Sequence, residues 1–163
     1  MSLLVRQVPV ADIVRLRRDV LRPGQPLTAS QYAEDDVALH LAAVADGQVV
    51  GCATFFPQDF PGPGEEDGPG DAHVPTEAVG LAAWRLRGMA TDAGHRSTGV
   101  GSTVLAAGLD AVRLAGGDLV WCNARTAALP FYERHGFVRI GSEFLTGGSV
   151  KVPHHRAWVL LQA

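Results

Sequence analysis

Apolar residues fall into short runs along the chain, and their spacing predicts strands and helices. The first run, 3–8, predicts a strand, and apolar residues near one face predict a helix over about 11–21. Two longer runs, 38–45 and 49–56, are joined by Asp46-Gly47. Because Asp-Gly between two apolar runs is typical of a tight turn, these runs predict an antiparallel hairpin.

The second half of the chain alternates strand and helix patterns, with strands expected over 81–91, 119–122, 137–145 and 156–161 and helices over about 99–115 and 126–135. Pro130 lies about one turn inside the second of these helices, which therefore either begins late or loses one hydrogen bond. A loop over 146–153 would join the last two strands. The resulting order, β-α-β-β-β-α-β-α-β-β, predicts an α/β fold of the α+β kind, a mixed sheet with helices on its faces.

The composition is that of an ordinary globular protein. The chain has 163 residues, of which 47% are hydrophobic and 19% charged, and its net charge is −3. This length predicts a single domain over 1–163. The basic residues are scattered, so we expect no nucleic-acid partner. Because no apolar run suits a signal peptide or a membrane span, we expect a cytoplasmic protein without a membrane partner.

Cysteine and histidine spacing gives no reason to expect a metal. Cys52 and Cys122 stand alone in separate apolar runs, as small core residues do. Of the six His residues only His154 and His155 are neighbours, and adjacent positions do not form the i, i+4 pair of a helical zinc site.

The segment 57–76 is rich in proline, glycine and acids, which predicts a surface loop. Its acids could draw a cationic substrate toward a site, although charges on a loop are usually only solvated. These acids are Asp59, Glu65, Glu66, Asp67 and Asp71.

The stretch 87–104 predicts a strand, a turn and a helix that starts near Gly99 and Gly101. A helix N-terminus offers unpaired backbone N–H groups and a positive dipole end to an anion, and glycine lets the ligand come close; glycine there is also ordinary loop chemistry. A dinucleotide-binding fold would need the pattern G-x-G-x-x-G or A here and an acid at the end of the next strand to hold the ribose. The third position of that pattern is Val104, and the next strand ends at Asn123, so this fold is excluded. Without Gly-Lys-Ser/Thr, a nucleotide-hydrolase phosphate loop is excluded too.

Two motifs resemble those of the GNAT superfamily of acyl-CoA N-acyltransferases. Arg-Ser-Thr-Gly-Val-Gly at 96–101 fits the R/Q-x-x-G-x-G/A signature, and Asn123 followed by Phe-Tyr-x-x-x-Gly-Phe at 131–137 resembles the second motif. The resemblance extends over most of the chain. It implies the GNAT fold, with a mostly antiparallel central sheet of about seven strands. A subgroup of small bacterial GNAT proteins with His-Arg-Ser-x-Gly-Val-Gly and a late Pro-His looks most similar.

The resemblance implies where coenzyme A would bind. Its pyrophosphate would contact the backbone amides of Arg96, Ser97, Thr98, Gly99, Val100, Gly101 and Ser102, with charge from Arg96. The pantetheine arm would lie along Met89, Ala90 and Thr91, and an N–H near Met89 or Ala90 would hold the thioester oxygen. Asn123 would bind pantetheine amides, unless it is a simple helix cap.

The same resemblance implies transfer of acetyl from acetyl-CoA to a primary amine by direct attack. Tyr132 is the expected general acid for the leaving thiolate, against the alternative of a Tyr ring that only packs. Glu143 and His154 are candidate bases, because each lies near the end of a late strand. Arg85 and Arg87 would share one face of a strand, where they either pair with acids or bind a substrate carboxylate.

Two other hypotheses about the function stay open. A domain of this fold could bind acyl-CoA as a sensor without turnover, or the turn could hold another phosphate ligand. The acceptor, whether a small metabolite, an antibiotic, a lysine or a protein N-terminus, is not specified, because the acidic loop and the long 146–152 connection depart from the similar subgroup. The resemblance to the family is also the one ground for expecting a homodimer.

Overall fold

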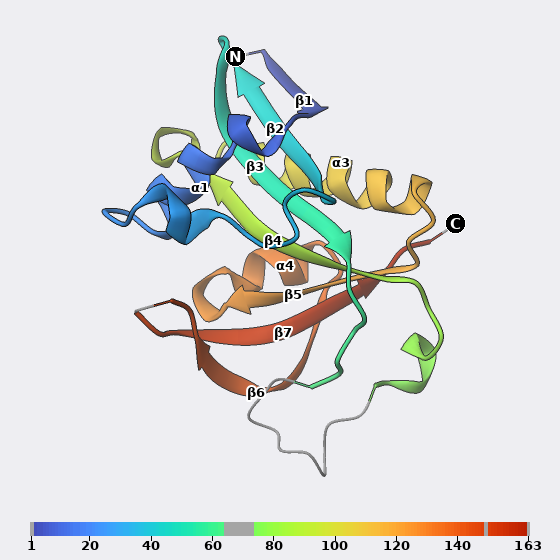
Figure 1. The fold of residues 1–163 in the computed structure, drawn as a ribbon. Coiled ribbons are helices and arrows are strands. Elements are labelled where there is room, and N and C mark those ends of the chain that lie inside the picture. The colour runs from blue at the N-terminus through green and yellow to red at the C-terminus, as the bar shows by residue number, and fades with distance from the viewer. Residues whose placement is uncertain (1, 64–73, 149, 163) are drawn as a thin grey trace. The chain divides into compact units, whose positions relative to one another are not determined.

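The computed structural model describes residues 2–63, 74–148 and 150–162. Of the loop acids, Glu65, Glu66, Asp67 and Asp71 lie outside the described residues. Seven strands form one sheet in the order β1-β2-β3-β4-β5-β7-β6 (Figure 1). They are β1 (Leu3–Gln7), β2 (Leu39–Ala45), β3 (Gln48–Pro57), β4 (Ala83–Thr91), β5 (Leu119–Arg125), β6 (Val138–Thr146) and β7 (Val152–Leu160). The α-helices of the described residues are α1 (Val14–Leu21), α3 (Val100–Leu114) and α4 (Leu129–Arg134).

The sheet is mixed, as the element order predicts. β4 and β5 run parallel, with Ala83 opposite Leu119. The pairs β1–β2, β2–β3, β5–β7 and β6–β7 are antiparallel. The prediction of a mixed, mostly antiparallel sheet of about seven strands is therefore confirmed.

Two compact units make up the chain. One contains Met1–Phe56 and Leu86–Val112, and the other contains Pro57–Arg85 and Arg113–Ala163. β4 begins in the second unit and ends in the first, so the residues that follow it in the chain belong to the first unit.

The first unit is built on the predicted hairpin of β2 and β3. Asp46 and Gly47 both have positive φ, 51° and 78°, as the tight turn between two twisted strands requires. Ala42 and Cys52 pair across the hairpin and pack with Ile13 and Ala90 into an apolar cluster. The α1 side chains Leu16 and Val20 pack against this cluster, so α1 covers that face.

α3 covers the opposite face of the hairpin, and two glycines let it come close. A Cβ at Gly51 of β3 would lie only 2.6 Å from Cγ1 of Val100, the first residue of α3. A Cβ at Gly108 would overlap the ring of Phe55. Because alternate strand residues face opposite sides, Gly51 and Phe55 face α3, whereas Cys52 faces α1. The start of α3 is thereby fixed beside β3.

The second unit has its own apolar core around β5 and β7. Leu119, Trp121 and Trp158 pack with Phe60 and Ala78. The Phe60 ring lies 6.1 Å from that of Trp121 and 5.5 Å from that of Trp158. This cluster ties the described start of the acidic loop to the sheet of this unit.

Several boundaries differ from the sequence-based expectations. β5 continues past residue 122 to Arg125, and β7 begins at Val152, so Pro153 and His154 lie within a strand and not in a loop. α1 is preceded by a 3-10 turn at Val10–Asp12. A second 3-10 turn, Thr126–Ala128, precedes α4, so the short helix begins late and Pro130 falls in its first turn, where no amide hydrogen is needed.

Candidate active site

The connection from β4 to α3 is ordered by Asp92. Its Oδ2 accepts hydrogen bonds from the Gly94 amide, at 3.1 Å, and from Nδ1 of His95, at 3.0 Å. These two hydrogen bonds lower the pKa of Asp92, and the bond from the His95 side chain has the larger effect. The Thr98 hydroxyl in turn donates to the carbonyl of His95. Local hydrogen bonds between Asp92 and Thr98 therefore define the conformation of the turn that precedes α3.

Two residues of this segment have left-handed backbone conformations. Ser97 has φ 62° and Gly99 has φ 85°. A positive φ at a residue with a Cβ is uncommon and costs about 1 kcal/mol or more, and such strain is concentrated at functional sites. A Cβ at Gly99 would meet no atom within 4 Å, so the space in front of this residue is open. The accessible backbone of this turn thus lies directly before the first amides of α3, a helix of 15 residues.

Backbone amides at the end of β4 point alternately to its two edges. The Asp92 amide donates to the Val50 carbonyl of β3, at 2.8 Å. Because successive strand amides point to opposite edges, the amides of Met89 and Thr91 point away from β3, whereas that of Ala90 points toward it. Of the two amides that the sequence left open for the thioester oxygen, Met89 alone has its N–H on the edge away from β3.

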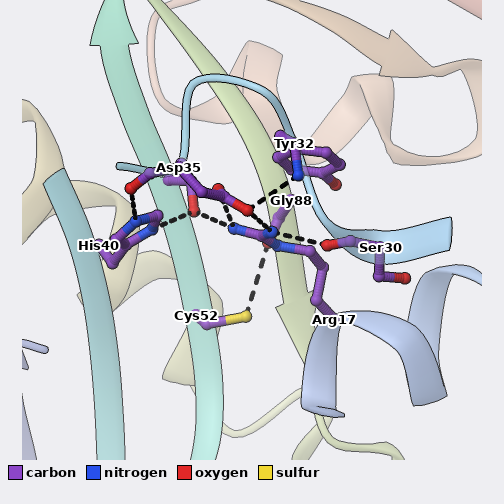
Figure 2. A network of polar contacts seen from close by, with 8 residues as sticks. Arg17, Ser30, Tyr32, Asp35, His40, Cys52 and Gly88 are labelled. Atoms are coloured by element: carbon purple, nitrogen blue, oxygen red, sulfur yellow. Dashed lines mark hydrogen bonds and ion pairs between the residues drawn. The ribbon is translucent and has the colours of Figure 1, made fainter. Parts of the chain in front are cut away.

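A buried polar network lies under β4 in the first unit, centred on Arg17 of α1 (Figure 2). The Arg17 side chain is fully buried. Its Nη1 and Nη2 donate to the Asp35 carboxylate at 3.0 and 3.2 Å, and also to the Ser30 carbonyl and the Thr54 hydroxyl. The guanidinium therefore fastens the segment between α1 and β2 onto β3.

His40 of β2 completes this network through both of its ring nitrogens. Its Nε2 lies 2.8 Å from the Asp35 carbonyl, which only accepts, so Nε2 carries a hydrogen. Its Nδ1 lies 2.9 Å from the Thr54 hydroxyl, which also accepts from Arg17. The chain of bonds runs from Arg17 through Thr54 to His40.

Tyr32 lies between two guanidinium groups. The Cζ of Arg17 is 4.0 Å from the centre of its ring, and that of Arg87 on β4 is 3.9 Å away. Two such groups do not fit on one face, so they lie on opposite faces of the ring. Burial raises the pKa of Tyr32, and the charges of Arg17 and Arg87 oppose that shift.

Gly88 of β4 lies against this pair, with φ 65°. A Cβ there would come within 2.8 Å of Nε of Arg17 and within 3.3 Å of the Tyr32 hydroxyl. The Gly88 carbonyl accepts from the Cys52 thiol at 3.5 Å. Glycine is therefore required at this point of β4 both by its backbone conformation and by the close approach of the network.

In the second unit, Asn123 lies within β5 and not at a helix cap. Its Oδ1 accepts from Nε of Arg156, directly opposite on β7, at 3.0 Å. Arg156 also donates to the carbonyls of Gly62 and Pro63. The helix-cap interpretation of Asn123 is wrong. Its oxygen accepts from Arg156, and its amide NH₂ can donate to a ligand.

Tyr132 of α4 is 7% exposed, and its ring packs edge-on against Phe131 and Phe137. Burial raises the pKa of Tyr132 well above the ordinary value of 10, with a smaller contribution from Cys122. Within the described residues its hydroxyl forms no hydrogen bond. The ring is therefore packed on both sides, and the hydroxyl is not among the buried polar atoms that lack a partner in the described residues.

The two candidate bases have different surroundings. Glu143 is exposed, in an irregular part of β6, and its Oε2 accepts from the Thr126 hydroxyl at 2.9 Å. The same hydroxyl lies 3.2 Å from Nδ1 of His155, which links Glu143 to His155 and not to His154. His154 is 9% exposed, bonds the Val152 carbonyl through Nδ1 and stacks on Phe144.

The predicted site residues therefore divide between the units. Met89, Ala90, Thr91 and the segment from Arg96 to Ser102 belong to the first unit; Asn123, Tyr132, Glu143 and His154 belong to the second. Among the described residues, no group of three His, Cys, Asp or Glu side chains is arranged to hold a metal, and no helix there is long and apolar enough to cross a membrane.

Comparison with known proteins identifies the family. The sequence profile of the Acetyltransferase (GNAT) family matches residues 11–137. The uncharacterized N-acetyltransferase YitI of Bacillus subtilis (strain 168) is 33% identical over 142 residues, which cover 86% of this chain and 85% of YitI. The chain belongs to the GNAT family. It is accordingly an acyltransferase.

Solved structures agree with the GNAT fold. Escherichia coli ElaA superposes with a TM-score of 0.69 at 14% identity, over 96% of this chain and 99% of ElaA. An aminoglycoside 6′-N-acetyltransferase complexed with coenzyme A gives a TM-score of 0.70 at 13% identity, over 98% of both chains. At these identities the likeness shows the fold of the GNAT chain and nothing of its acceptor.

Proposed function

We propose that this GNAT chain transfers the acetyl group of acetyl-CoA to a primary amine, with 1–163 acting as one catalytic domain. The observation that carries the proposal is the open, left-handed backbone at Ser97 and Gly99, directly before α3. Left-handed residues next to a helix N-terminus turn several amides toward one point, which suits a diphosphate. A cytoplasmic location and a homodimer stay predictions from the sequence.

The residues of the first unit fit coenzyme A. The amides from Arg96 to Ser102 would hold its pyrophosphate, and the exposed Arg96 would add charge. The N–H of Met89, on the edge of β4 away from β3, would bind the thioester oxygen as negative charge develops there. Acetyl-CoA supplies the activated acetyl group. In the second unit, the Asn123 NH₂ would donate to a pantetheine carbonyl.

The proposed reaction is a direct transfer. The amine nitrogen forms a bond to the acetyl carbon, and the bond from that carbon to sulfur breaks. Tyr132 gives its hydroxyl proton to the departing thiolate, and the raised pKa keeps that proton in place at neutral pH. The new N–H⁺ loses its proton through water to His154 or to the linked pair Glu143 and His155. Atoms and charge balance without a covalent enzyme intermediate.

The amides from Arg96 to Ser102 form the proposed pyrophosphate cradle. This cradle is tested with matched glutamate substitutions at the glycines that flank α3. Gly99 and Gly116 both have positive φ, 85° and 95°, and a Cβ meets nothing within 4 Å at either. Gly99→Glu brings a carboxylate to the proposed pyrophosphate site, so we expect coenzyme A affinity by calorimetry to fall at least about 100-fold. Gly116→Glu carries the same backbone strain and should bind normally. Equal affinities in both variants would rule out the cradle.

A screen for acetyl-CoA consumption over many primary amines tests turnover separately. Release of free thiol that depends on an amine supports the transferase. Tight coenzyme A binding with no acetylation of any amine would instead favour a sensor of acyl-CoA.

A further inference from the structure

Arg87 of β4 has a stacking partner but no hydrogen-bond acceptor. Its guanidinium lies flat on Tyr32, with Cζ 3.9 Å from the ring centre. No described residue forms a hydrogen bond or an ion pair with it. The side chain is half-buried. Because stacking covers the face of the guanidinium and not its edge, Arg87 presents a fork of N–H donors beside Tyr32.

The charges around Tyr32 leave one positive charge unbalanced. Arg17, on one face of the ring, is paired through both terminal nitrogens with Asp35. On the other face, no carboxylate of the described residues lies within ion-pair distance of Arg87. Two guanidinium groups with one carboxylate therefore give a net charge of one. A single planar anion with two oxygens matches both this charge and the fork geometry.

Arg87 is also close in the chain to the proposed acetyl site. It precedes Met89 by two residues, which is about 7 Å of extended strand. The Tyr32 hydroxyl lies beside Gly88, the residue between them, and it forms no hydrogen bond with any described residue. A donor fork and a free hydroxyl thus flank β4 within the span of a small molecule.

We propose that Arg87 binds a carboxylate of the acceptor, so that the acceptor of this enzyme is an amine that also carries a carboxylate. This inference rests on the proposed N-acetyltransferase function and adds the chemical class of its substrate. Tyr32 holds the Arg87 guanidinium in plane, and the buried bonds of Arg17 and Asp35 hold Tyr32. Arg87 is in this sense a specificity residue, and Tyr32 and Arg17 are positioning residues.

The test compares primary amines in matched pairs. Each pair contains a short amino acid and the alkylamine of the same length, and aminoalkyl phosphates form a third arm. We expect the wild-type kcat/KM to be about tenfold or more higher for the amino acid, which is the effect of one charge-assisted hydrogen-bonded pair. Arg87→Gln should remove this preference mainly by raising KM, and Arg87→Lys should restore part of it. Arg139→Gln, at an exposed arginine of β6, should keep the preference.

Calorimetric titration of the same amino acids into CoA-loaded protein separates this inference from the proposed function. If the wild type acetylates no amine but binds amino acids, and Arg87→Gln does not, the inference holds and the transferase proposal fails. If alkylamines and amino acids are acetylated equally, or if Arg87→Gln keeps the preference, the inference is wrong and the transferase proposal stands. A preference for the phosphates would overturn the carboxylate assignment. If the protein neither binds amino acids nor acetylates any amine, both the inference and the transferase proposal are wrong.

Discussion

The Tyr132 hydroxyl combines a raised pKa with the lack of a hydrogen-bond partner among the described residues. A raised pKa keeps the proton on the oxygen, so the residue can act as an acid but not as a base at neutral pH. It also reduces the driving force for proton transfer to a thiolate. The effect of this group on turnover should therefore lie at the lower end of the range for general acids.

Tyr132→Phe removes only the hydroxyl and keeps the contacts with Phe131 and Phe137. We expect kcat to fall by about 100-fold and the affinity for acetyl-CoA to change by less than about threefold. Steady-state kinetics and calorimetric titration measure the two quantities. An unchanged kcat would remove Tyr132 from the mechanism.

Gly88 is the residue of β4 that the buried network most constrains. Gly88→Ala adds a Cβ that meets Nε of Arg17 at 2.8 Å, and Arg17 is held by four hydrogen bonds and is not free to move. Together with the positive φ, this overlap should lower the free energy of unfolding by about 2–4 kcal/mol.

Gly80→Ala is the matched control for that substitution. Gly80 has φ 77°, but a Cβ there meets nothing within 4 Å. It should lower the free energy of unfolding by only about 1 kcal/mol, from backbone strain alone. Urea unfolding of both variants tests the difference, and equal losses would mean that Arg17 does not crowd β4.

The sequence predicts some of these residues and misses others for a physical reason. The glycine turn before α3 is predictable, because its residues are neighbours in the chain. The network of Arg17, Asp35 and Thr54 joins residues far apart in sequence, so spacing does not predict it. One signal was present: Arg17 follows Ile13 by four positions and so lies on the apolar face of α1, where a charged residue needs a buried partner.

At the scale of elements, local chemistry predicts turns better than strand ends. The hairpin at Asp46-Gly47 is confirmed, because the turn type depends on two residues. The start of β7 is missed, because Pro153 suggests a loop. Pro153 is tolerated as the second residue of that strand, where it pairs opposite Leu145. Asn123 is likewise drawn into β5 by Arg156, a partner 33 positions away.

The packing of α3 on β3 gives a prediction about elements. Gly108→Ala improves helix propensity by about 1 kcal/mol, but its Cβ would overlap the fully buried Phe55 ring. Overpacking in a dense core costs about 1–3 kcal/mol, so we expect a net loss of stability in urea unfolding. Phe55→Leu added to Gly108→Ala should recover part of that loss, since it makes room. If Gly108→Ala alone is stabilising, α3 is not seated on Phe55 as described.

At the scale of the whole molecule, family and fold follow from short motifs, whereas the acceptor does not. The motifs at 96–101 and 123–137 are local, and they are enough to indicate the GNAT fold that the comparisons confirm. The proposed acceptor site depends on side chains from different elements: Arg87 on β4, and Tyr32 in the segment before β2, on which Arg87 stacks. Such sets become visible only when the chain is folded.

The two cysteines give a prediction for the stability of the whole chain at high pH. Burial raises the pKa of Cys52 and of Cys122 from the ordinary value of 9 to about 12. Below pH 9 both thiols are protonated whether the chain is folded or unfolded, so their full contribution to stability is present there. Between pH 9 and 12 only the unfolded chain loses these protons, and the free energy of unfolding falls as pH rises.

Each thiol should lower the free energy of unfolding by about 1.4 kcal/mol per pH unit in that window. Urea unfolding at several pH values from 8 to about 11 measures the slope. Cys52→Ala and Cys122→Ala should each reduce it by the share of one thiol, even though either substitution also lowers stability at pH 8. Since the slope reports proton binding and not packing, a slope that neither substitution changes would mean that the thiols are not buried in the folded chain.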